Sequence, residues 1–360
     1  MLKTFSITNF KCFRHLAIPD LAQINLITGL NNVGKTALLE ALFLHAGHFN
    51  PTLSLTINVF RGLPLSTPTP DVIWGWCFTD RNLEKTIQLQ GMTDDGRQLT
   101  LSIASIPVKT PTPAPNDAPS ASPSTTAGVS LTAAPVRHEL LYTHTSQDGQ
   151  PVTNRLTLND QGIPIAKSAP PSRITAAFLP SRTMFHMEDA TILDRLNMEK
   201  RQPEILEMVR FFDPRIKGFS LSALWGPLTI VVDIEGQEHL MPLPFAGEGL
   251  AHFLSILLHV VQVSPGNLLL IDEIDNGIHF SILPKVWSAI FQMALKSQVQ
   301  IVATTHNREC VMAAHKASST LLGYPFRLHR LERLRDNSLQ VISYDRETLS
   351  TVLAADFEVR

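Results

Sequence analysis

The fold is decided by one stretch, Gly29-Leu-Asn-Asn-Val-Gly34-Lys35-Thr36, which matches the pattern G-x-x-x-x-G-K-[ST]. Residues 24–28 before it are typical of a strand, and residues 36–49 after it carry apolar residues at helical spacing. In such a loop the glycines let successive backbone N–H groups face a phosphate, and the helix adds its positive N-terminal end. We therefore expect Lys35 to reach the β- and γ-phosphates of a nucleotide and the Thr36 hydroxyl to ligate Mg²⁺.

Two acidic residues end a second strand, far from this loop in sequence. Residues 267–271 form a largely apolar run that is typical of a strand buried on both faces, and Asp272 and Glu273 follow it directly. Together with a phosphate loop, Asp272 would hold Mg²⁺ through water, and Glu273 would be the general base toward the attacking water. The alternative is a strand that simply meets a surface loop.

Two further segments carry polar groups that a nucleotide site would use. His306 follows the apolar residues 301–303 and could hydrogen-bond the γ-phosphate and sense its loss, with Thr305 as a secondary contact. Residues 246–249, Ala-Gly-Glu-Gly, open a helix whose free N-terminus could bind a second phosphate. The alternatives are a structural histidine and an ordinary helix cap.

Strand-like and helical segments alternate along the chain, which predicts a parallel α/β core. Strand-like runs at 4–7 and 24–28 flank a turn with Pro19. Three β-hairpins are predicted from alternating apolar and polar residues around turn residues, at 86–103, 137–158 and 326–344. We assign 1–103 to the N-terminal part of the domain that carries the phosphate loop, 131–185 to the remaining β lobe, 186–217 to a helical arm and 218–360 to the C-terminal part of that domain.

Residues 104–130 differ from the rest because Pro, Ser, Thr and Ala dominate them. Such a composition buries too little apolar surface to offset the entropy of ordering. We interpret the segment as a flexible surface insertion; a polyproline ligand is the alternative.

The composition excludes several classes of protein. The 360 residues carry 30 Lys and Arg against 32 Asp and Glu, so a net charge of −2 argues against a histone-like basic chain. Three cysteines without a C-x-x-C pair argue against a disulfide scaffold or zinc ribbon. The most apolar helical stretch, 250–263, is shorter than the ~20 residues of a membrane span. A cytoplasmic protein without a membrane partner is expected.

The order of phosphate loop, Gly-Glu-Gly helix start, Asp-Glu strand end and histidine resembles an ATP-binding-cassette (ABC) type ATPase. The nearest group contains the structural-maintenance-of-chromosomes (SMC) heads, RecF and the overcoming-lysogenization-defect (OLD) ATPases. The phrases that carry this resemblance are Ile7-Thr-Asn-Phe-Lys-Cys-Phe, Phe178-Leu-Pro-Ser-Arg182, Ile271-Asp-Glu-Ile-Asp-Asn-Gly-Ile-His279 and Phe357-Glu-Val-Arg360. They are most similar to small stand-alone AAA-type members related to OLD.

The resemblance implies a P-loop NTPase fold, an ABC-type head with a mixed sheet core, an antiparallel β lobe and a small helical arm. It implies ATP and Mg²⁺ as ligands and an ATP-dependent homodimer in which each signature helix caps the γ-phosphate held by the other subunit. Asp275 and His279 would lie in a dimer-facing loop, and Ser181 or Arg182 near the Gln-loop. The site residues implied by position are Gly29, Asn31, Asn32, Gly34, Lys35 and Thr36 (Walker A), Ala246, Gly247, Glu248 and Gly249 (signature, with Ala246 where many members have Ser), Asp272 and Glu273 (Walker B) and His306 (switch).

Several functions compete within this class. The first is a nucleotide-switched ATPase that serves a DNA-related or anti-phage defence function with a separately encoded nuclease or toprim-like effector. A built-in OLD-type nuclease is disfavoured, because the 54 residues after His306 hold no D-x-D pair and are fewer than the ~100 of a toprim domain. A RecF-type repair ATPase that binds DNA directly remains the alternative. A transporter cassette would need the standard Leu-Ser-Gly-Gly-Gln signature, and a chromosome-tethering head a long coiled coil.

DNA binding would need a local basic patch. Two groups of arginines and lysines could make phosphate-binding faces. They are Arg195, Lys200, Arg201 and Arg210 in the middle of the chain, and Arg327, Arg330, Arg333 and Arg335 near its C-terminus. Solvated charges on a helix or an edge strand are the alternative.

Overall fold

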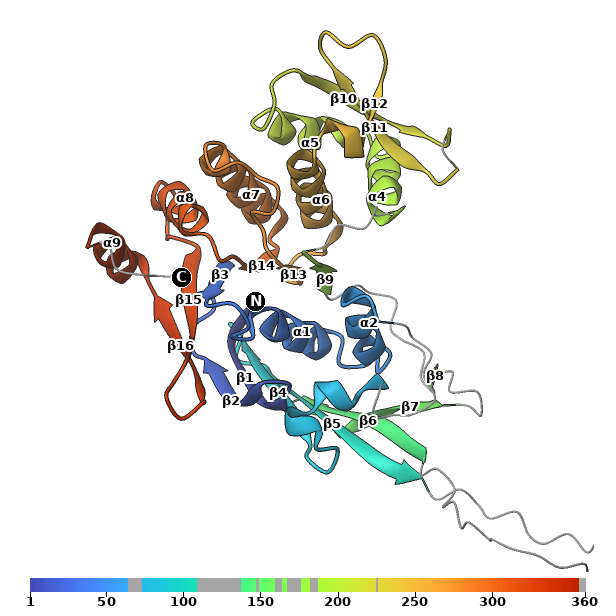
Figure 1. The fold of residues 1–360 in the computed structure, drawn as a ribbon, viewed down its shortest axis with the longest axis vertical. Coiled ribbons are helices and arrows are strands. Elements are labelled where there is room, and N and C mark those ends of the chain that lie inside the picture. The colour runs from blue at the N-terminus through green and yellow to red at the C-terminus, as the bar shows by residue number, and fades with distance from the viewer. Residues whose placement is uncertain are drawn as a thin grey trace, which may run out of the picture.

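The computed structural model describes residues 1–63, 73–108, 137–146, 149–158, 164–166, 176–181, 187–224 and 226–355. Helix α1 lies between two large sheets, and α6, α7 and α8 cover the other face of the upper sheet (Figure 1). These layers confirm the predicted α/β class with a mixed core and an antiparallel β lobe. The helices named here are α1 (Lys35–Ala46), α6 (Glu248–Gln262), α7 (Leu283–Ser297) and α8 (Arg308–Ser319).

The upper sheet is mixed and carries the predicted buried strands. Its order is β16-β15-β3-β14-β13-β9, and all neighbours are parallel except the β15–β16 hairpin. Because the four central strands are parallel, the residues that follow them gather at one edge of the sheet. The strands are β3 (Ile24–Gly29), β9 (Ala176–Leu179), β13 (Leu268–Ile271), β14 (Gln300–Thr304), β15 (Phe326–Arg333) and β16 (Leu339–Tyr344).

The lower sheet, which forms the β lobe, is antiparallel, in the order β2-β1-β4-β5-β6-β7-β8. Two of the three expected hairpins are confirmed here as the pairs β4–β5 and β6–β7, and the third is the pair β15–β16 of the mixed sheet. The N-terminal strand joins this sheet, whereas β3 joins the mixed one, since β1 buries mainly one face while β3 is buried throughout. The strands are β1 (Leu2–Phe10), β2 (Phe13–Ile18), β4 (Ile87–Thr93), β5 (Gln98–Val108), β6 (Arg137–Ser146), β7 (Val152–Leu158) and β8 (Pro164–Ala166).

The expected flexible insertion is corrected at its start. Residues 104–108 continue β5 and pair with β6, because Leu101 and Ile103 already bury one face and the ladder extends through Val108. Residues 109–130, Arg182 and the closing residues 357–360 lie outside the described part of the chain, so the predictions that concern them stay predictions.

The arm is larger than the predicted helical segment. Helices α4 (Met187–Met198) and α5 (Gln202–Val209) confirm its helices, but a separate sheet of β10 (Ile216–Ser222), β11 (Thr229–Ile234) and β12 (Met241–Pro242) belongs to it as well. The arm therefore extends past residue 217, where we expected it to end. Its sheet packs on α4 and α5, and Figure 1 shows it beyond α6 at the end of the molecule away from the lower sheet.

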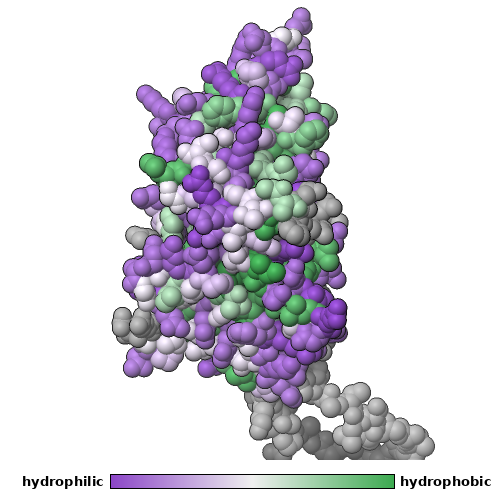
Figure 2. All heavy atoms as spheres, turned by 90° about the vertical axis from the view of Figure 1, so that its left-hand side faces the viewer, coloured by the Kyte–Doolittle hydropathy of each residue, from purple (hydrophilic) through white to green (hydrophobic). Residues whose placement is uncertain are grey.

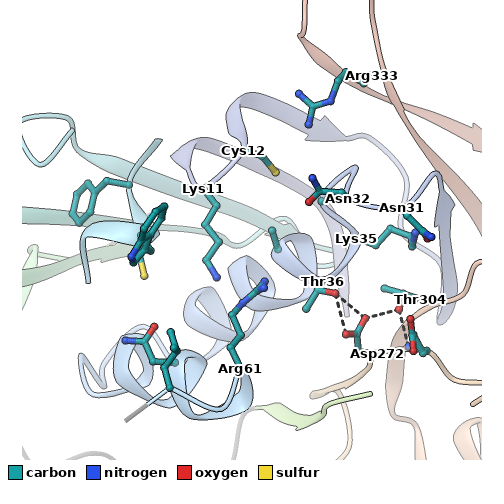
Figure 3. A pocket seen from close by; sticks show the side chains of 18 of the residues that line it. Lys11, Cys12, Asn31, Asn32, Lys35, Thr36, Arg61, Asp272, Thr304 and Arg333 are labelled. Carbon is teal, nitrogen blue, oxygen red and sulfur yellow. Dashed lines mark hydrogen bonds between the residues drawn. The ribbon is translucent and has the colours of Figure 1, made fainter. Parts of the chain in front are cut away.

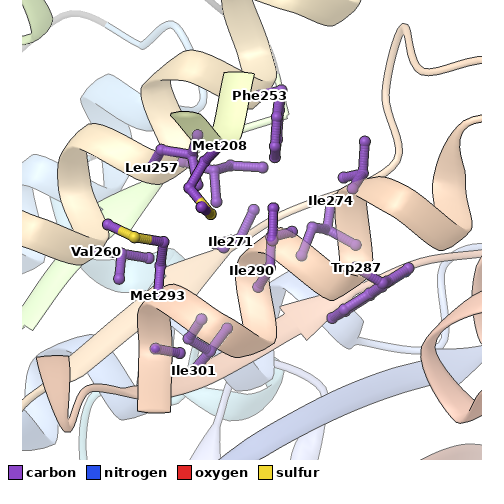
Figure 4. Close-up of a cluster of buried hydrophobic side chains, with 14 of the residues drawn as sticks. Met208, Phe253, Leu257, Val260, Ile271, Ile274, Trp287, Ile290, Met293 and Ile301 are labelled. Carbon is purple, nitrogen blue, oxygen red and sulfur yellow. The ribbon is translucent and has the colours of Figure 1, made fainter. Parts of the chain in front are cut away.

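One hydrophobic cluster joins the arm to the mixed sheet. Figure 4 shows Met208 of α5 beside Leu257 of α6, above Ile271 of β13. A second cluster fills the space between α1 and the lower sheet. Two further α-helices within the described ranges are α2 (Leu53–Phe60) and α9 (Arg346–Ala354). Within the described ranges, no helix has the length and apolar character that a membrane crossing requires.

Candidate functional site

A cavity of about 1100 Å³ lies at the carboxyl edge of the mixed sheet, between that sheet and the β lobe (Figure 3). Its volume lies slightly above the usual range of small-molecule sites, about 300–1,000 Å³. The cavity brings together segments from across the sequence. Its lining includes Asn31, Asn32, Gly34, Lys35 and Thr36 of the predicted loop, Asp272, Glu273 and Thr304 at strand ends, and His306. Seven further lining residues were not predicted for a nucleotide site: Lys11, Cys12, Arg61, Trp76, Asp80, Arg81 and Arg333.

The loop 29–36 needs its two glycines. Gly29 and Gly34 have φ values of 137° and 109°, which side chains with a Cβ rarely adopt. A Cβ on Gly29 would lie 2.4 Å from the carbonyl oxygen of Leu331, and one on Gly34 would lie 2.7 Å from Cys12 Sγ. The loop thus packs between β15 and the β1–β2 turn, and its last two residues, Lys35 and Thr36, are the first two of α1.

Lys35 folds over this loop. Its Nζ donates hydrogen bonds to the carbonyl oxygens of Gly29 at 2.8 Å and Leu30 at 3.1 Å. Burial lowers the pKa of Lys35, and the nearby carboxylates of Asp272 and Glu273 oppose this shift. The ammonium group is therefore held at the mouth of the loop, where an anion can exchange for the two carbonyl contacts.

Asp272 is the centre of a hydrogen-bonded chain. Its two carboxylate oxygens accept from the Thr36 hydroxyl at 3.1 and 2.9 Å, and Oδ1 also accepts from the Thr304 hydroxyl at 2.7 Å. Thr304 Oγ1 in turn accepts from the backbone N–H of Glu273 at 2.8 Å. The parallel strands β13 and β14 thus fix the position of Asp272 relative to the first turn of α1.

Glu273 and His306 lie side by side at the edge of the cavity. The His306 Nδ1 and Glu273 Oε1 atoms are 3.8 Å apart, and both side chains are exposed. Glu273 adopts a left-handed φ of 54°, an uncommon backbone conformation for a residue with a side chain. Such conformations concentrate at functional sites, where surrounding hydrogen bonds compensate for the strain.

Thr305 does not contact the cavity, contrary to our expectation. It is fully buried, and its hydroxyl donates to Asp275 Oδ1 at 2.6 Å. Thr304 lines the cavity instead, since successive side chains of a strand point to opposite faces. The Asn276 side chain donates to the Ser181 carbonyl oxygen at 3.0 Å, which ties the loop after Asp272 to the end of β9.

The predicted signature residues 246–249 lie apart from this cavity in the same chain, and none of them lines it. Gly247, with a φ of 116°, precedes the first turn of α6. Gly249 packs on the loop after Asp272, where a Cβ would lie 2.2 Å from the Gly277 carbonyl oxygen. Phe245 lies just before residues 246–249 and is 80% exposed, and Phe280 lies three residues after Gly277 and is 62% exposed.

A buried acid with two basic partners was missed by the sequence reasoning. Glu40 of α1 is 1% exposed and pairs with Lys11 Nζ at 2.5 Å and Arg61 Nε at 2.7 Å. The hydrogen bonds that Arg61 donates to Glu40 raise the pKa of Arg61, and burial opposes this shift. Figure 3 shows Lys11 and Arg61 on the side of Thr36 away from Thr304. Lys11 stands in the quoted phrase 7–13, whereas Arg61 carried no sequence signal of a site.

Two known domain families match the chain. Residues 1–93 match a family described as "AAA ATPase domain", and residues 135–311 match one described as "AAA domain, putative AbiEii toxin, Type IV TA system". The chain is 23% identical over 331 residues to a protein of Helicobacter pylori named "ATP/GTP phosphatase", covering 86% of both chains. It is 31% identical over 110 residues to an uncharacterised protein of Methanocaldococcus jannaschii, covering 28% of this chain and 46% of that one.

A solved structure shares the fold. The SMC head bound to the C-terminal winged-helix domain of ScpA matches 97% of this chain and 99% of its own, with a TM-score of 0.50 and 11% identity. The solved structure shows the fold, and both family models that match parts of the chain describe AAA-type domains. The narrower placement among OLD-related ATPases stays a prediction.

Proposed function

We propose that the cavity binds ATP with Mg²⁺ and hydrolyses it, and that the head acts as a nucleotide switch. The observation that carries this proposal is the Thr36–Asp272–Thr304 chain beside Lys35 and Glu273. A phosphate loop, a hydroxyl and two adjacent carboxylates are the groups that hydrolysis of a nucleoside triphosphate requires. The name of the H. pylori relative agrees with such an activity.

The oxygen atoms of Thr36 and Asp272 fit a magnesium ion. They already lie within hydrogen-bond distance of each other, and hydroxyl and carboxylate oxygens are the ligands that Mg²⁺ takes in nucleotide sites. When bound, the ion would neutralise charge on the phosphates. Thr304 would orient Asp272 through its hydrogen bond to Oδ1.

Glu273 is the candidate general base. Its carboxylate lies at the cavity edge next to Asp272, where it can accept a proton from water aligned with the γ-phosphate. His306, 3.8 Å from that carboxylate, would hydrogen-bond the γ-phosphate and register its release. Lys35 would exchange its two carbonyl contacts for phosphate oxygens.

A second copy of the chain would complete the site. Residues 246–249 do not line their own chain's cavity, and Phe245 and Phe280 beside them are exposed. Leu30, in the phosphate loop, is likewise 71% exposed. Exposed apolar side chains at both candidate surfaces favour association of two heads when nucleotide is bound.

The biological role we propose is a DNA-related or defence function with a separately encoded effector. The match of residues 135–311 to a domain family described with the AbiEii toxin supports the defence direction. The relative in the solved structure binds ScpA, so a partner protein is in keeping with this fold. Purification of the chain under native conditions, followed by identification of the co-purifying protein, would test the effector.

Direct DNA binding, as in RecF, is the second candidate, but the arginines give it little support. Arg195, Arg201, Arg327 and Arg330 each have a carboxylate within 4.0 Å, and Arg333 lines the cavity. Figure 2 shows the side on which α9 lies in Figure 1, where hydrophilic residues predominate around apolar spots. Titration with duplex DNA at 50 mM salt, where contacts to the DNA phosphates are strong, tests this candidate. A DNA affinity that rises steeply as the salt concentration falls would favour it.

The central proposal is tested by phosphate release from ATP with Mg²⁺ and after addition of EDTA. Turnover with Mg²⁺ that stops with EDTA is the expected result. Light scattering with and without ATP, using the slow Glu273→Gln variant, tests the dimer. A wild-type chain that neither binds nor hydrolyses ATP would refute the proposal.

A further inference from the structure

The lining of the cavity includes an exposed aromatic side chain, Trp76, that the phosphate chemistry leaves unexplained. In residues 74–78, Trp74, Cys77 and Phe78 are at most 4% exposed, whereas Trp76 is 58% exposed and lines the cavity. Packing of the core accounts for the three buried neighbours but not for Trp76. An exposed indole on the wall of a cavity is a natural contact surface for a flat ligand group.

The backbone around Trp76 is tied to the β lobe. The N–H of Lys11 donates to the Cys77 carbonyl oxygen at 2.8 Å, and Phe10 and Phe78 form an isolated β-bridge. The Thr79 hydroxyl donates to the Phe13 carbonyl oxygen at 3.2 Å. These contacts hold the segment that carries Trp76 in a fixed position against residues 10–13.

A short distance further along the chain, two residues that also line the cavity hold an unusual backbone conformation. Asp80 and Arg81 have φ values of 58° and 54°, so two consecutive non-glycine residues are left-handed. Both line the cavity, and the Arg81 guanidinium lies 4.7 Å from the centre of the Trp76 ring. Strain of this kind is typical of segments that clamp ligands. This segment places the Trp76–Arg81 cation–aromatic pair and the Asp80 carboxylate in the lining of one cavity.

We propose that the Trp76–Arg81 pair is the shelf on which the base of a bound purine nucleoside triphosphate stacks, and that Asp80 accepts hydrogen bonds from the base. This inference rests on the proposed function, because phosphates held by Lys35 leave the base in the remaining part of the cavity. Indole and guanidinium planes both stack on nucleobases, independently of the base's hydrogen-bonding edge.

Asp80 makes guanine a substrate base as well as adenine. Its ion pairs with Arg14 at 3.6 Å and Lys85 at 3.9 Å are long, so the carboxylate retains acceptor capacity. A carboxylate has two acceptor oxygens, which match the paired N1–H and N2–H donors of guanine. Adenine offers only its amino group. The site therefore takes GTP at least as tightly as ATP.

The shelf is tested by calorimetric binding of ATP, GTP and inorganic tripolyphosphate, each with Mg²⁺. Trp76→Ala should weaken both nucleotides about tenfold and leave tripolyphosphate, which has no base, unchanged. Trp76→Phe should bind nucleotides nearly as the wild type does, since a phenyl ring can also stack. The matched control is Leu322→Ala, a fully exposed position that does not line the cavity. Unchanged nucleotide affinity in Trp76→Ala, or an equal loss for tripolyphosphate, would overturn the shelf.

The base preference is tested with Asp80→Asn. Asparagine pairs with adenine by donating and accepting, so the ratio of GTP to ATP affinity should fall about tenfold. An unchanged ratio would remove Asp80 from base recognition. Failure of the shelf is distinguishable from failure of the proposed function, because a wild-type chain that binds none of the three probes refutes the nucleotide site itself.

Discussion

The Thr36 hydroxyl donates to both carboxylate oxygens of Asp272, at 3.1 and 2.9 Å, across 236 residues of sequence. This contact joins the first turn of α1 to the end of β13. The register of β13 against β14 and of β14 against β3 holds it in place, because the three strands deliver their ends to one edge of the sheet. Two short motifs thus become a single site through strand pairing.

Replacement of Thr36 by Val removes the hydroxyl and keeps the side-chain shape. We expect the Mg²⁺ concentration for half-maximal ATP hydrolysis to rise about 10- to 100-fold, the range typical of altered metal sites. Titration of activity with Mg²⁺ measures this shift. Thr305→Val is the matched control, since Thr305 does not line the cavity; an equal effect in both variants would contradict a metal role for Thr36.

Lys35→Ala should weaken ATP binding about 100-fold, because charge-assisted hydrogen bonds to two phosphates are lost. ATP-driven dimerisation should disappear with it. Calorimetry and light scattering on the same sample measure both properties. A dimer that forms equally well without nucleotide would contradict the switch.

Glu273→Gln keeps the shape of the side chain and removes its ability to take a proton. ATP should still bind, while hydrolysis should slow at least ~100-fold, the scale of a lost general base. Single-turnover measurements separate the two steps. Near-normal turnover would assign the base to another group.

Gly249→Ala should strain the packing of α6 on the loop after β13, since the new Cβ would lie 2.2 Å from the Gly277 carbonyl oxygen. We expect the free energy of unfolding to fall by about 1–3 kcal/mol, as for other overpacked sites. Gly218→Ala, where a Cβ meets nothing within 4 Å, is the control. Urea unfolding compares the two, and equal stabilities would show that the loop yields without cost.

Stability should decrease below about pH 6.5 through His329. Its ring is buried between Asn25 and Ser343, and burial lowers its pKa to about 4. Between the ordinary value of 6.5 and about 4 the unfolded chain binds a proton that the folded chain does not, so the free energy of unfolding falls with falling pH.

Below about pH 4 this contribution no longer changes. The His329→Gln variant should therefore show a shallower pH dependence from 6.5 to 4, by up to about 1.4 kcal/mol per pH unit. Urea unfolding at several pH values checks the slope, with the exposed His239→Gln as control. Parallel curves for wild type and His329→Gln would contradict the expectation.

Sequence alone determined the elements whose pattern is local. The phosphate loop, the apolar runs of β13 and β14, the hairpins and the major helices follow from residue order, because helical spacing, strand burial and turn chemistry act over short distances. Asp272, Glu273 and Lys35 could be proposed as site residues because their motifs are contiguous.

Only the tertiary structure decided which separate segments meet. Strand β9 is four residues long without alternation, and its place in the sheet is set by parallel pairing with the distant strand β13. The Lys11–Glu40–Arg61 cluster and the Trp76–Arg81 pair come from segments that no motif links. The positions of these residues depend on long-range packing and on strand register. Both are selected by the free energy of the whole folded chain, so they leave no fixed spacing in the sequence.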